Sequence, residues 1–299
     1  MRCAGAGRKG PAAGGLGIKK VWISGANGHI GTALCARLDR NRYDLIPTDV
    51  EDVDVTDMEA ARAFAEKTRP DVIINCTGFN DEDGCETHPE RAFRVNAVAA
   101  RNLALAADDL GAKLLQMSTD DVFAEPSHHP YNEFDTPCPK TLYGRSKLAG
   151  ERFVMTLCHR YVIVRSAWVY GIGQDFVSTV LGCARDPNCP WLAVATDRVA
   201  SPTGADDLAA AVEQLMDRPA LGIYHVVCQG HCSRYDFARE ILRDAHLEDQ
   251  LVLHPIRAAD AGGAPSYTVL DNMMLRLDGI PQPRPWRTAL RAYIEGLEP

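Results

Sequence analysis

The sequence predicts an α/β protein built on a doubly wound parallel sheet, with a smaller α/β lobe in its C-terminal part. Two observations predict this fold class. After residue 18, short apolar runs alternate with longer amphipathic stretches, which is typical of a parallel sheet covered on both faces by helices. A glycine-rich turn also joins the first apolar run to the first amphipathic stretch. Because strand–helix–strand connections are right-handed, such a series winds helices onto both faces of the sheet.

Each element follows from this alternation. The apolar runs predict five strands, at Lys19–Ser24, Tyr43–Thr48, Asp71–Cys76, Lys113–Met117 and Tyr161–Arg165. The stretches between them predict helices near residues 29–40, 57–68, 88–110 and 141–158. Further along, the patterns predict strands at Trp191–Ala195 and Gly222–Val227, helices at Asp206–Asp217, Ser233–Ala245 and Trp286–Gly296, and a loop over residues 255–265.

The chain divides into three parts by the same patterns. Residues 1–17 are rich in Gly and Ala, carry little that could be buried, and are expected to form a flexible extension. Residues 18–170 are expected to form mainly a nucleotide-binding domain of Rossmann type. Residues 171–299 are expected to form mainly a substrate-binding lobe, with some segments returning to the main sheet.

Composition narrows the class of protein. The chain has 299 residues, of which 46% are hydrophobic and 24% charged, and a net charge of -8. An acidic chain of this kind is a poor candidate for binding nucleic acid, which needs a basic face. No apolar run approaches the roughly 18 residues of a membrane span. Its 10 cysteines include no Cys-x-x-Cys pair, which predicts reduced thiols and a cytoplasmic location.

The glycine-rich turn has the sequence Gly-Ala-Asn-Gly-His-Ile-Gly over residues 25–31. Glycine tolerates positive φ and lets the backbone approach a pyrophosphate, while the following helix N-terminus offers free N–H groups. With a strand before it and a helix after it, the turn predicts dinucleotide binding. The candidate contacts in the turn are Gly25, Asn27, Gly28, His29, Ile30 and Gly31.

Further cofactor contacts are expected at the ends of the next strands. Asp49 ends the second strand about 20 residues past the turn, where an acid can bind the ribose hydroxyls of NAD. A carboxylate there repels a 2′-phosphate and favours NADH, although NADPH stays open. The remaining candidates lie beyond the second strand and after the third, at Asp54, Val55, Cys76, Thr77 and Gly78.

A Tyr-x-x-x-Lys pair opens the helix predicted over residues 141–158. Tyr143 and Lys147, four residues apart, share one helix face. A phenol has an ordinary pKa near ~10, and an adjacent ammonium lowers it toward the range useful for proton transfer. Thr119, at the carboxyl end of the fourth strand, can complete a Thr/Tyr/Lys set. These residues predict acid–base chemistry at a carbinol or carbonyl oxygen.

These motifs together resemble the extended short-chain dehydrogenase/reductase family, and within it the branch of the dTDP-4-dehydrorhamnose reductases. The resemblance covers roughly residues 19–297 and rests on STDDVF (118–123), TLYGRSKLAGE (141–151), RSAWVYG (165–171) and DRVASPTG (197–204). It implies a reductase of a 4-keto-6-deoxy nucleotide sugar that uses NADPH or NADH and no assigned metal. It implies catalytic roles for Thr119, Tyr143 and Lys147, with Asp120, Asp121 and Trp168 beside Thr119 in the substrate pocket. Homodimers are common in the family.

Three departures keep alternatives open. The reductase branch has tyrosine where this chain has Asp121. A related dehydratase has an Asp-Glu pair there and uses it for acid–base chemistry. Phe123 and the segment RSAWVYG favour the reductase over the dehydratase. Four acids in residues 81–86 either face the pocket or form a solvated loop. Ala264 replaces an arginine that could bind an anionic substrate. A different sugar substrate, or a non-catalytic role like that of the methionine adenosyltransferase regulatory subunit, is therefore also considered.

Overall fold

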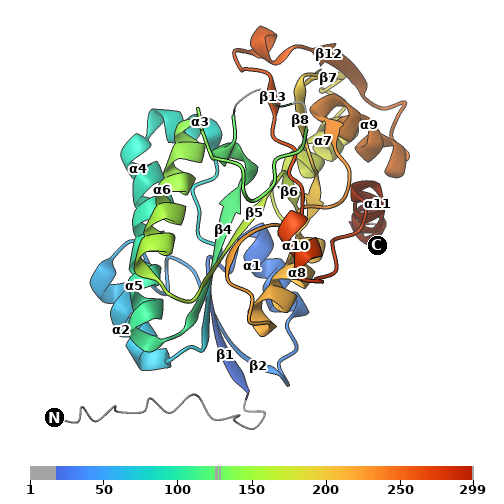
Figure 1. Ribbon diagram of the computed structural model, residues 1–299. Helices are drawn as coiled ribbons and strands as arrows, with labels where there is room; N and C mark the ends of the chain where they lie inside the picture. Colours follow the sequence, from blue (N-terminus) through green and yellow to red (C-terminus); the bar gives the residue numbers. More distant parts are fainter. Residues whose placement is uncertain (1–17, 125–126, 128, 298–299) are drawn as a thin grey trace, which may run out of the picture.

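The computed structural model describes residues 18–124, 127 and 129–297 (Figure 1). The predicted extension over residues 1–17 lies outside the described residues. The centre of the molecule is a sheet of six strands, and they are parallel, as predicted. In spatial order the strands are β10 (Gly222–His225), β5 (Tyr161–Ser166), β4 (Lys113–Thr119), β3 (Val72–Asn75), β1 (Lys19–Ser24) and β2 (Tyr43–Thr48).

Helices cover both faces of this sheet (Figure 1). One face carries α1 (His29–Arg37) and α8 (Ala205–Asp217); the other carries α2 (Met58–Thr68), α5 (Ala99–Leu110) and α6 (Leu142–Leu157). Side chains alternate along a strand, so Val21 and Ile23 pack into one core and Trp22 into the other. Both cores are apolar, which explains why the strands are continuous apolar runs in the sequence.

The helix predicted over residues 88–110 is interrupted. It consists of α4 (Pro89–Phe93), a π-helical turn η1 (Arg94–Val98) and α5. The buried amide of Asn96 lies in this turn, accepts a hydrogen bond from the Phe79 N–H at 2.8 Å and donates to Ser146 Oγ at 2.9 Å. A π-turn often marks a functional site. This one ties the loop after β3 to the helix that carries Tyr143.

The smaller lobe has its own core, built around Phe237, Ile241 and Trp286. Its strand β12 (Val252–Ile256) pairs in parallel with β7 (Trp191–Ala195). The loop predicted over residues 255–265 is therefore partly wrong, because the strand runs to Ile256 and a 3-10 turn follows. Its elements are β6 (Val169–Tyr170), α7 (Phe176–Arg185), β7 (Trp191–Ala195), β8 (Arg198–Ala200), β9 (Thr203–Gly204), β11 (Cys232–Ser233), α9 (Arg234–Asp244), β12 (Val252–Ile256), η3 (Ala258–Ala261), β13 (Ser266–Tyr267) and α11 (Trp286–Leu297). Helix α10 (Met273–Leu277) instead packs against the main sheet, beside β10.

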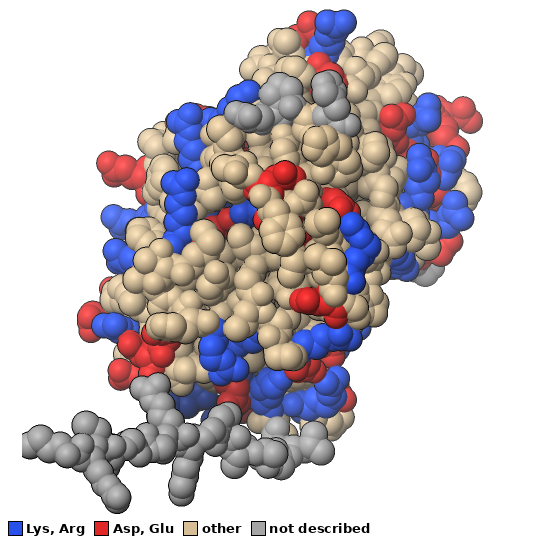
Figure 2. Space-filling model, viewed as in Figure 1, with Lys and Arg blue, Asp and Glu red and all other residues tan. Residues whose placement is uncertain are grey.

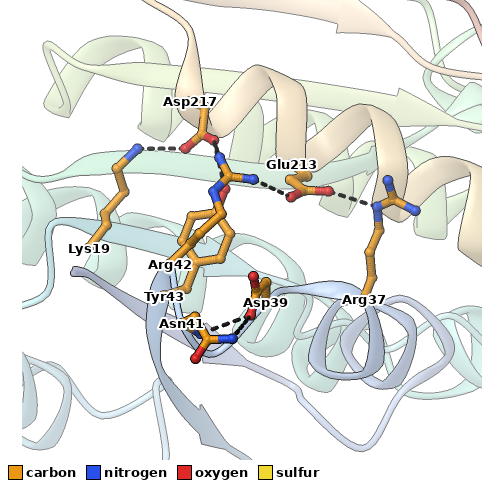
Figure 3. A network of polar contacts seen from close by, with 8 residues as sticks. All are labelled: Lys19, Arg37, Asp39, Asn41, Arg42, Tyr43, Glu213 and Asp217. Carbon is orange, nitrogen blue, oxygen red and sulfur yellow. Dashed lines mark hydrogen bonds and ion pairs between the residues drawn. The ribbon is translucent and has the colours of Figure 1, made fainter. Parts of the chain in front are cut away.

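A polar network holds α8 against the first βα unit (Figure 3). Asp217 accepts from Lys19 at 2.7 Å and from Arg42 at 2.6 Å, and Glu213 accepts from Arg37 at 2.9 Å. Exposed ion pairs of this kind contribute about 0–1 kcal/mol each, so the apolar contact between α1 and α8 contributes more to holding them together. Among the described helices, none has the length and apolarity needed to cross a bilayer.

Candidate active site

The glycine-rich turn is shaped by close backbone contacts. Gly25 has φ +73°, and a Cβ there would lie 2.7 Å from the Thr77 backbone nitrogen. A Cβ on Gly31 would lie 2.4 Å from the Gly25 carbonyl oxygen. Helix α1 has no side-chain cap and no acid in its first turn, so its N–H groups are free for an anion. The turn therefore fits the pyrophosphate of a dinucleotide.

The other predicted cofactor residues lie at the same edge of the sheet. The Asp49 carboxylate accepts from the Asn27 N–H at 3.1 Å, and Thr77 Oγ1 hydrogen-bonds Ser24 Oγ at 2.7 Å. Gly78 follows Thr77 directly. Further along, Asp54 Oδ1 accepts from the Thr56 N–H at 2.9 Å, and the Val55 side chain is buried in the core on the α5 side.

A cleft of about 380 Å³ joins the predicted cofactor and substrate residues. Its lining includes ten of them: Gly28, His29, Ile30, Cys76, Thr119, Asp120, Asp121, Tyr143, Lys147 and Trp168. His29 also reaches the smaller lobe, since its Nε2 lies 3.2 Å from the Gln174 carbonyl oxygen. Its buried Nδ1 has no hydrogen-bond partner among the described residues. The cleft thus lies between the glycine-rich turn and the smaller lobe.

Helix α6 delivers the Tyr-x-x-x-Lys pair. Its first turn packs against the 3-10 turn η2 (Asp120–Val122) so tightly that a Cβ on Gly144 would lie 2.2 Å from the Asp121 carbonyl oxygen. The Tyr143 hydroxyl donates to Asn80 Oδ1 at 3.4 Å, and Lys147 Nζ donates to the Met117 carbonyl at 2.9 Å. Tyr143, Lys147 and Thr119 therefore share one cleft.

The pKa values of this pair depend mainly on burial. Burial lowers the pKa of Lys147 to about 8, and the Glu151 carboxylate acts in the opposite direction. Burial, and then the Asp121 charge, raise the pKa of Tyr143, while a hydrogen bond with Thr119 opposes the rise. The sequence predicted that Lys147 lowers the pKa of Tyr143, and the protein chain by itself does not show this lowering. A phenol that stays protonated is the form that can donate a proton.

Acidic side chains gather next to Tyr143, and Figure 2 shows acidic groups near the middle of this face. Asp120 Oδ1 accepts from Thr119 Oγ1 at 3.2 Å, and Asp120 Oδ2 accepts from the Thr268 hydroxyl. Burial raises the pKa of Asp120 to about 6. Burial, and then the charges of Asp120 and Glu82, raise the pKa of Asp121 well above its usual range. The pair therefore holds a proton more firmly than exposed carboxyls do.

The acidic segment over residues 81–86 is neither wholly in the pocket nor wholly solvated. It forms most of the short helix α3 (Glu82–Thr87). Glu82 lines the cleft, whereas Glu86 Oε1 accepts from the Leu142 N–H at 2.8 Å and supports the start of α6. One carboxylate therefore faces the site and another positions a helix.

A buried ion pair lies behind the catalytic candidates, and sequence reasoning missed it. Glu151, one turn after Lys147, accepts from Arg165 Nε at 2.9 Å and from its terminal nitrogen at 2.7 Å. It also accepts from Ser118 Oγ at 2.5 Å. Both side chains of the pair are at most 1% exposed. The one signal in the sequence was a charged residue ending an apolar strand.

Trp168 lies where the cleft meets the smaller lobe. Its φ of +42° is unusual for a bulky residue and marks local strain. Its ring lines the cleft and lies 6.3 Å from that of Phe237, so it belongs to both the pocket wall and the core. The guanidinium of Arg234 covers the Trp168 ring at 3.6 Å from its centroid. Arg234 and Asn80 are pocket residues that the sequence motifs did not indicate.

Fold and site together define a class: the protein is an oxidoreductase of the extended short-chain dehydrogenase/reductase type, which uses a nicotinamide cofactor. The family model described as RmlD substrate binding domain matches residues 19–298, and the chain belongs to that family. Within the described residues, no group of three or more His, Cys, Asp or Glu side chains is placed to hold a metal ion.

Relatives agree along nearly the whole chain. A dTDP-4-dehydrorhamnose reductase of Mycobacterium tuberculosis (strain ATCC 25618 / H37Rv) is 35% identical over 287 residues, covering 92% of each chain. The spore coat polysaccharide biosynthesis protein SpsK of Bacillus subtilis (strain 168) is 35% identical over 282 residues, covering 93% of this chain and 98% of SpsK. The structure of dTDP-4-dehydrorhamnose reductase from Bacillus anthracis str. Ames in complex with NADP is 34% identical, with a TM-score of 0.90, covering 94% of this chain and 100% of that one.

Proposed function

We propose that the protein reduces the ketone of a 4-keto-6-deoxy nucleotide sugar, with dTDP-4-dehydro-L-rhamnose as the substrate and dTDP-L-rhamnose as the product. The observation that carries the proposal is the convergence of Thr119, Tyr143 and Lys147 in the cleft that begins at the glycine-rich turn. The names of the reductases from M. tuberculosis and B. anthracis support the choice of sugar.

In the proposed reaction a bound NADPH or NADH supplies the hydride. Tyr143 donates its phenolic proton to the C4 oxygen, and its raised pKa keeps that proton in place until the oxygen becomes basic. Thr119 hydrogen-bonds the same oxygen. Lys147 binds the cofactor ribose, with its ammonium directed by the Met117 carbonyl. Asp120, Asp121 and Trp168 line the space for the sugar.

The test is turnover of the ketosugar. The protein is incubated with NADPH or NADH and with dTDP-4-dehydro-L-rhamnose made by the enzymes that precede it, while cofactor oxidation is followed and the product is identified by NMR. We expect one cofactor oxidised per sugar reduced. Oxidation with another 4-keto sugar but not this one would move the proposal to that substrate.

A non-catalytic role is the second candidate, and the departures at Asp121 and Ala264 are what favour it. The same assay separates the two. Binding of the cofactor with no oxidation of it by any 4-keto sugar would overturn the reductase and leave a regulatory, nucleotide-binding role.

A further inference from the structure

Arg234 is fixed in the cleft by aromatic rings. It stands at the start of α9, and its guanidinium lies 3.6 Å from the centroid of the Trp168 ring and 4.6 Å from that of Phe176. All three side chains line the cleft that also holds Tyr143. Stacking on two rings restricts the plane of the guanidinium without using any of its N–H groups.

Those N–H groups have no partner in the part of the chain that the structure describes. Arg234 makes no hydrogen bond and no ion pair there. Burial lowers its pKa to about 10, so it remains a cation at neutral pH, and the charges of Asp120 and Glu82 partly oppose that shift. Arg165 provides the contrast: its guanidinium is fully buried, whereas Arg234 is half-buried, and Glu151 binds Arg165 through two hydrogen bonds.

A second arginine near the acidic side of the site, Arg198, is already engaged. Arg198, on β8, lies 3.9 Å from a Glu82 carboxylate oxygen and donates to the Ala264 carbonyl at 3.4 Å. Position 264 itself supplies no charge. Arg234 is therefore the guanidinium in this cleft whose donors are free for a ligand.

We propose that Arg234 binds the diphosphate of the nucleotide-sugar substrate through its paired N–H donors. The inference rests on the proposed function, because it takes the substrate to be a sugar linked to a nucleoside diphosphate. A planar, fully protonated guanidinium matches two phosphate oxygens at once, whereas a sugar hydroxyl uses one donor and gains less from the charge. Arg234 would thus supply the cation that Ala264 does not.

Binding measurements test this without turnover. Arg234→Met, Arg234→Lys and the control Arg239→Met, an exposed arginine on the same helix, are titrated calorimetrically with dTDP, thymidine and NADPH. We expect Arg234→Met to weaken dTDP binding roughly 10- to 100-fold, the size of a lost charged hydrogen-bond pair. Arg234→Lys should lose less, because it keeps the charge but not the paired geometry. Thymidine and NADPH affinities should stay within about twofold in every variant, as expected for a contact to the substrate phosphates alone.

Several outcomes would overturn the inference. One is that the unaltered protein does not bind dTDP, and another is that Arg234→Met and Arg239→Met bind dTDP with equal affinity. A third is that Arg234→Met loses affinity for NADPH and not for dTDP, which would place the arginine on a cofactor phosphate. A raised KM for the ketosugar with unchanged dTDP affinity would place it on the sugar. Arg234→Lys keeps the test valid if Arg234→Met fails to fold. If Arg234 governs dTDP affinity but no ketosugar is reduced, the proposed reaction fails while this inference stands.

Discussion

The two walls of the cleft are built on different principles. On the cofactor wall, backbone atoms at the ends of β1 and β3 approach so closely that Gly25 has no room for a side chain. On the substrate wall, charged side chains come from η2, α3 and α9, and burial and neighbouring charges shift the pKa values of Asp120, Asp121 and Arg234. The first wall is complete before a ligand binds. The second holds unused donors and extra protons that a ligand can use.

Replacing Tyr143, where the two walls meet, should have the largest effect. Tyr143→Phe removes the proposed proton donor and leaves the ring, so kcat should fall by roughly 10²- to 10⁴-fold. The dissociation constant of NADPH should change by no more than about twofold, because the lost hydroxyl serves proton transfer rather than binding. Steady-state cofactor oxidation and calorimetry measure the two effects. Tyr161→Phe, at the opposite end of β5, is the control; equal kcat in both variants would remove Tyr143 from the mechanism.

Gly25→Ala tests the cofactor wall. The new Cβ would meet the Thr77 backbone nitrogen at 2.7 Å in a left-handed conformation, so the turn must move. We expect NADPH binding to weaken by about 100-fold or more and the free energy of unfolding to fall by about 1–3 kcal/mol. Gly111→Ala is a matched control, since Gly111 also has a positive φ, of +67°, but nothing lies within 4 Å of its Cβ position. Equal NADPH affinity in the two variants would show that the clash is unimportant.

The cofactor wall was also the part that the sequence predicted well. Strands β1 and β2 have the predicted bounds, and the glycine-rich turn lies where the pattern placed it. The reason is physical: each motif there lies within one element and its neighbours in sequence, and backbone geometry dictates the residue type. The predicted start of α8 was one residue late: the helix begins at Ala205, and Gly204 before it offers no side-chain cap.

The substrate wall could be predicted only in part. Thr119, Tyr143 and Lys147 belong to short motifs, but Arg234, Asn80 and Thr268 reach the site from distant segments. Their roles depend on which charges remain unpaired after folding, and a pattern along one chain does not show this. The departures at Asp121 and Ala264 indicated that the wall had changed, without showing that Arg234 stands free in it.

Glu151→Gln asks how the core supports the Tyr-x-x-x-Lys pair. Loss of one partner of the buried pair with Arg165 should lower the free energy of unfolding by about 3–5 kcal/mol, measured by denaturant unfolding. The pH profile of kcat/KM should change as well. Glu151 raises the pKa of Lys147, which burial holds near about 8, and its removal leaves Arg165 unneutralised nearby. Lys147 then loses its proton at a lower pH.

As the pH rises through the pKa of Lys147, kcat/KM should fall. In Glu151→Gln this fall should begin at a lower pH than in the unaltered protein. The control is Glu213→Gln, which removes a carboxylate from the exposed α8 network. It should lower stability by about 1 kcal/mol or less and leave the pH profile unchanged. A Glu151→Gln variant that is less stable but keeps the unaltered pH profile would limit Glu151 to a structural role.

Asp121→Asn should have the smallest effect, and it tests whether the protons on the substrate wall matter for binding. Burial and the charges of Asp120 and Glu82 raise the pKa of Asp121, so the carboxyl is neutral in acid and gains its charge only as the pH rises. That charge repels an anionic nucleotide sugar. The KM of the unaltered protein should therefore rise as the pH rises and Asp121 loses its proton. Asp121→Asn should flatten this rise, giving a KM a few-fold lower at the basic end and an equal KM at the acidic end. Asp83→Asn removes a similar charge from the exposed side of α3 and should leave the KM profile unchanged. If Asp121→Asn and Asp83→Asn give the same profile, the acids beside Tyr143 do not act on the substrate charge, and the contrast between the two walls would rest on Arg234 alone.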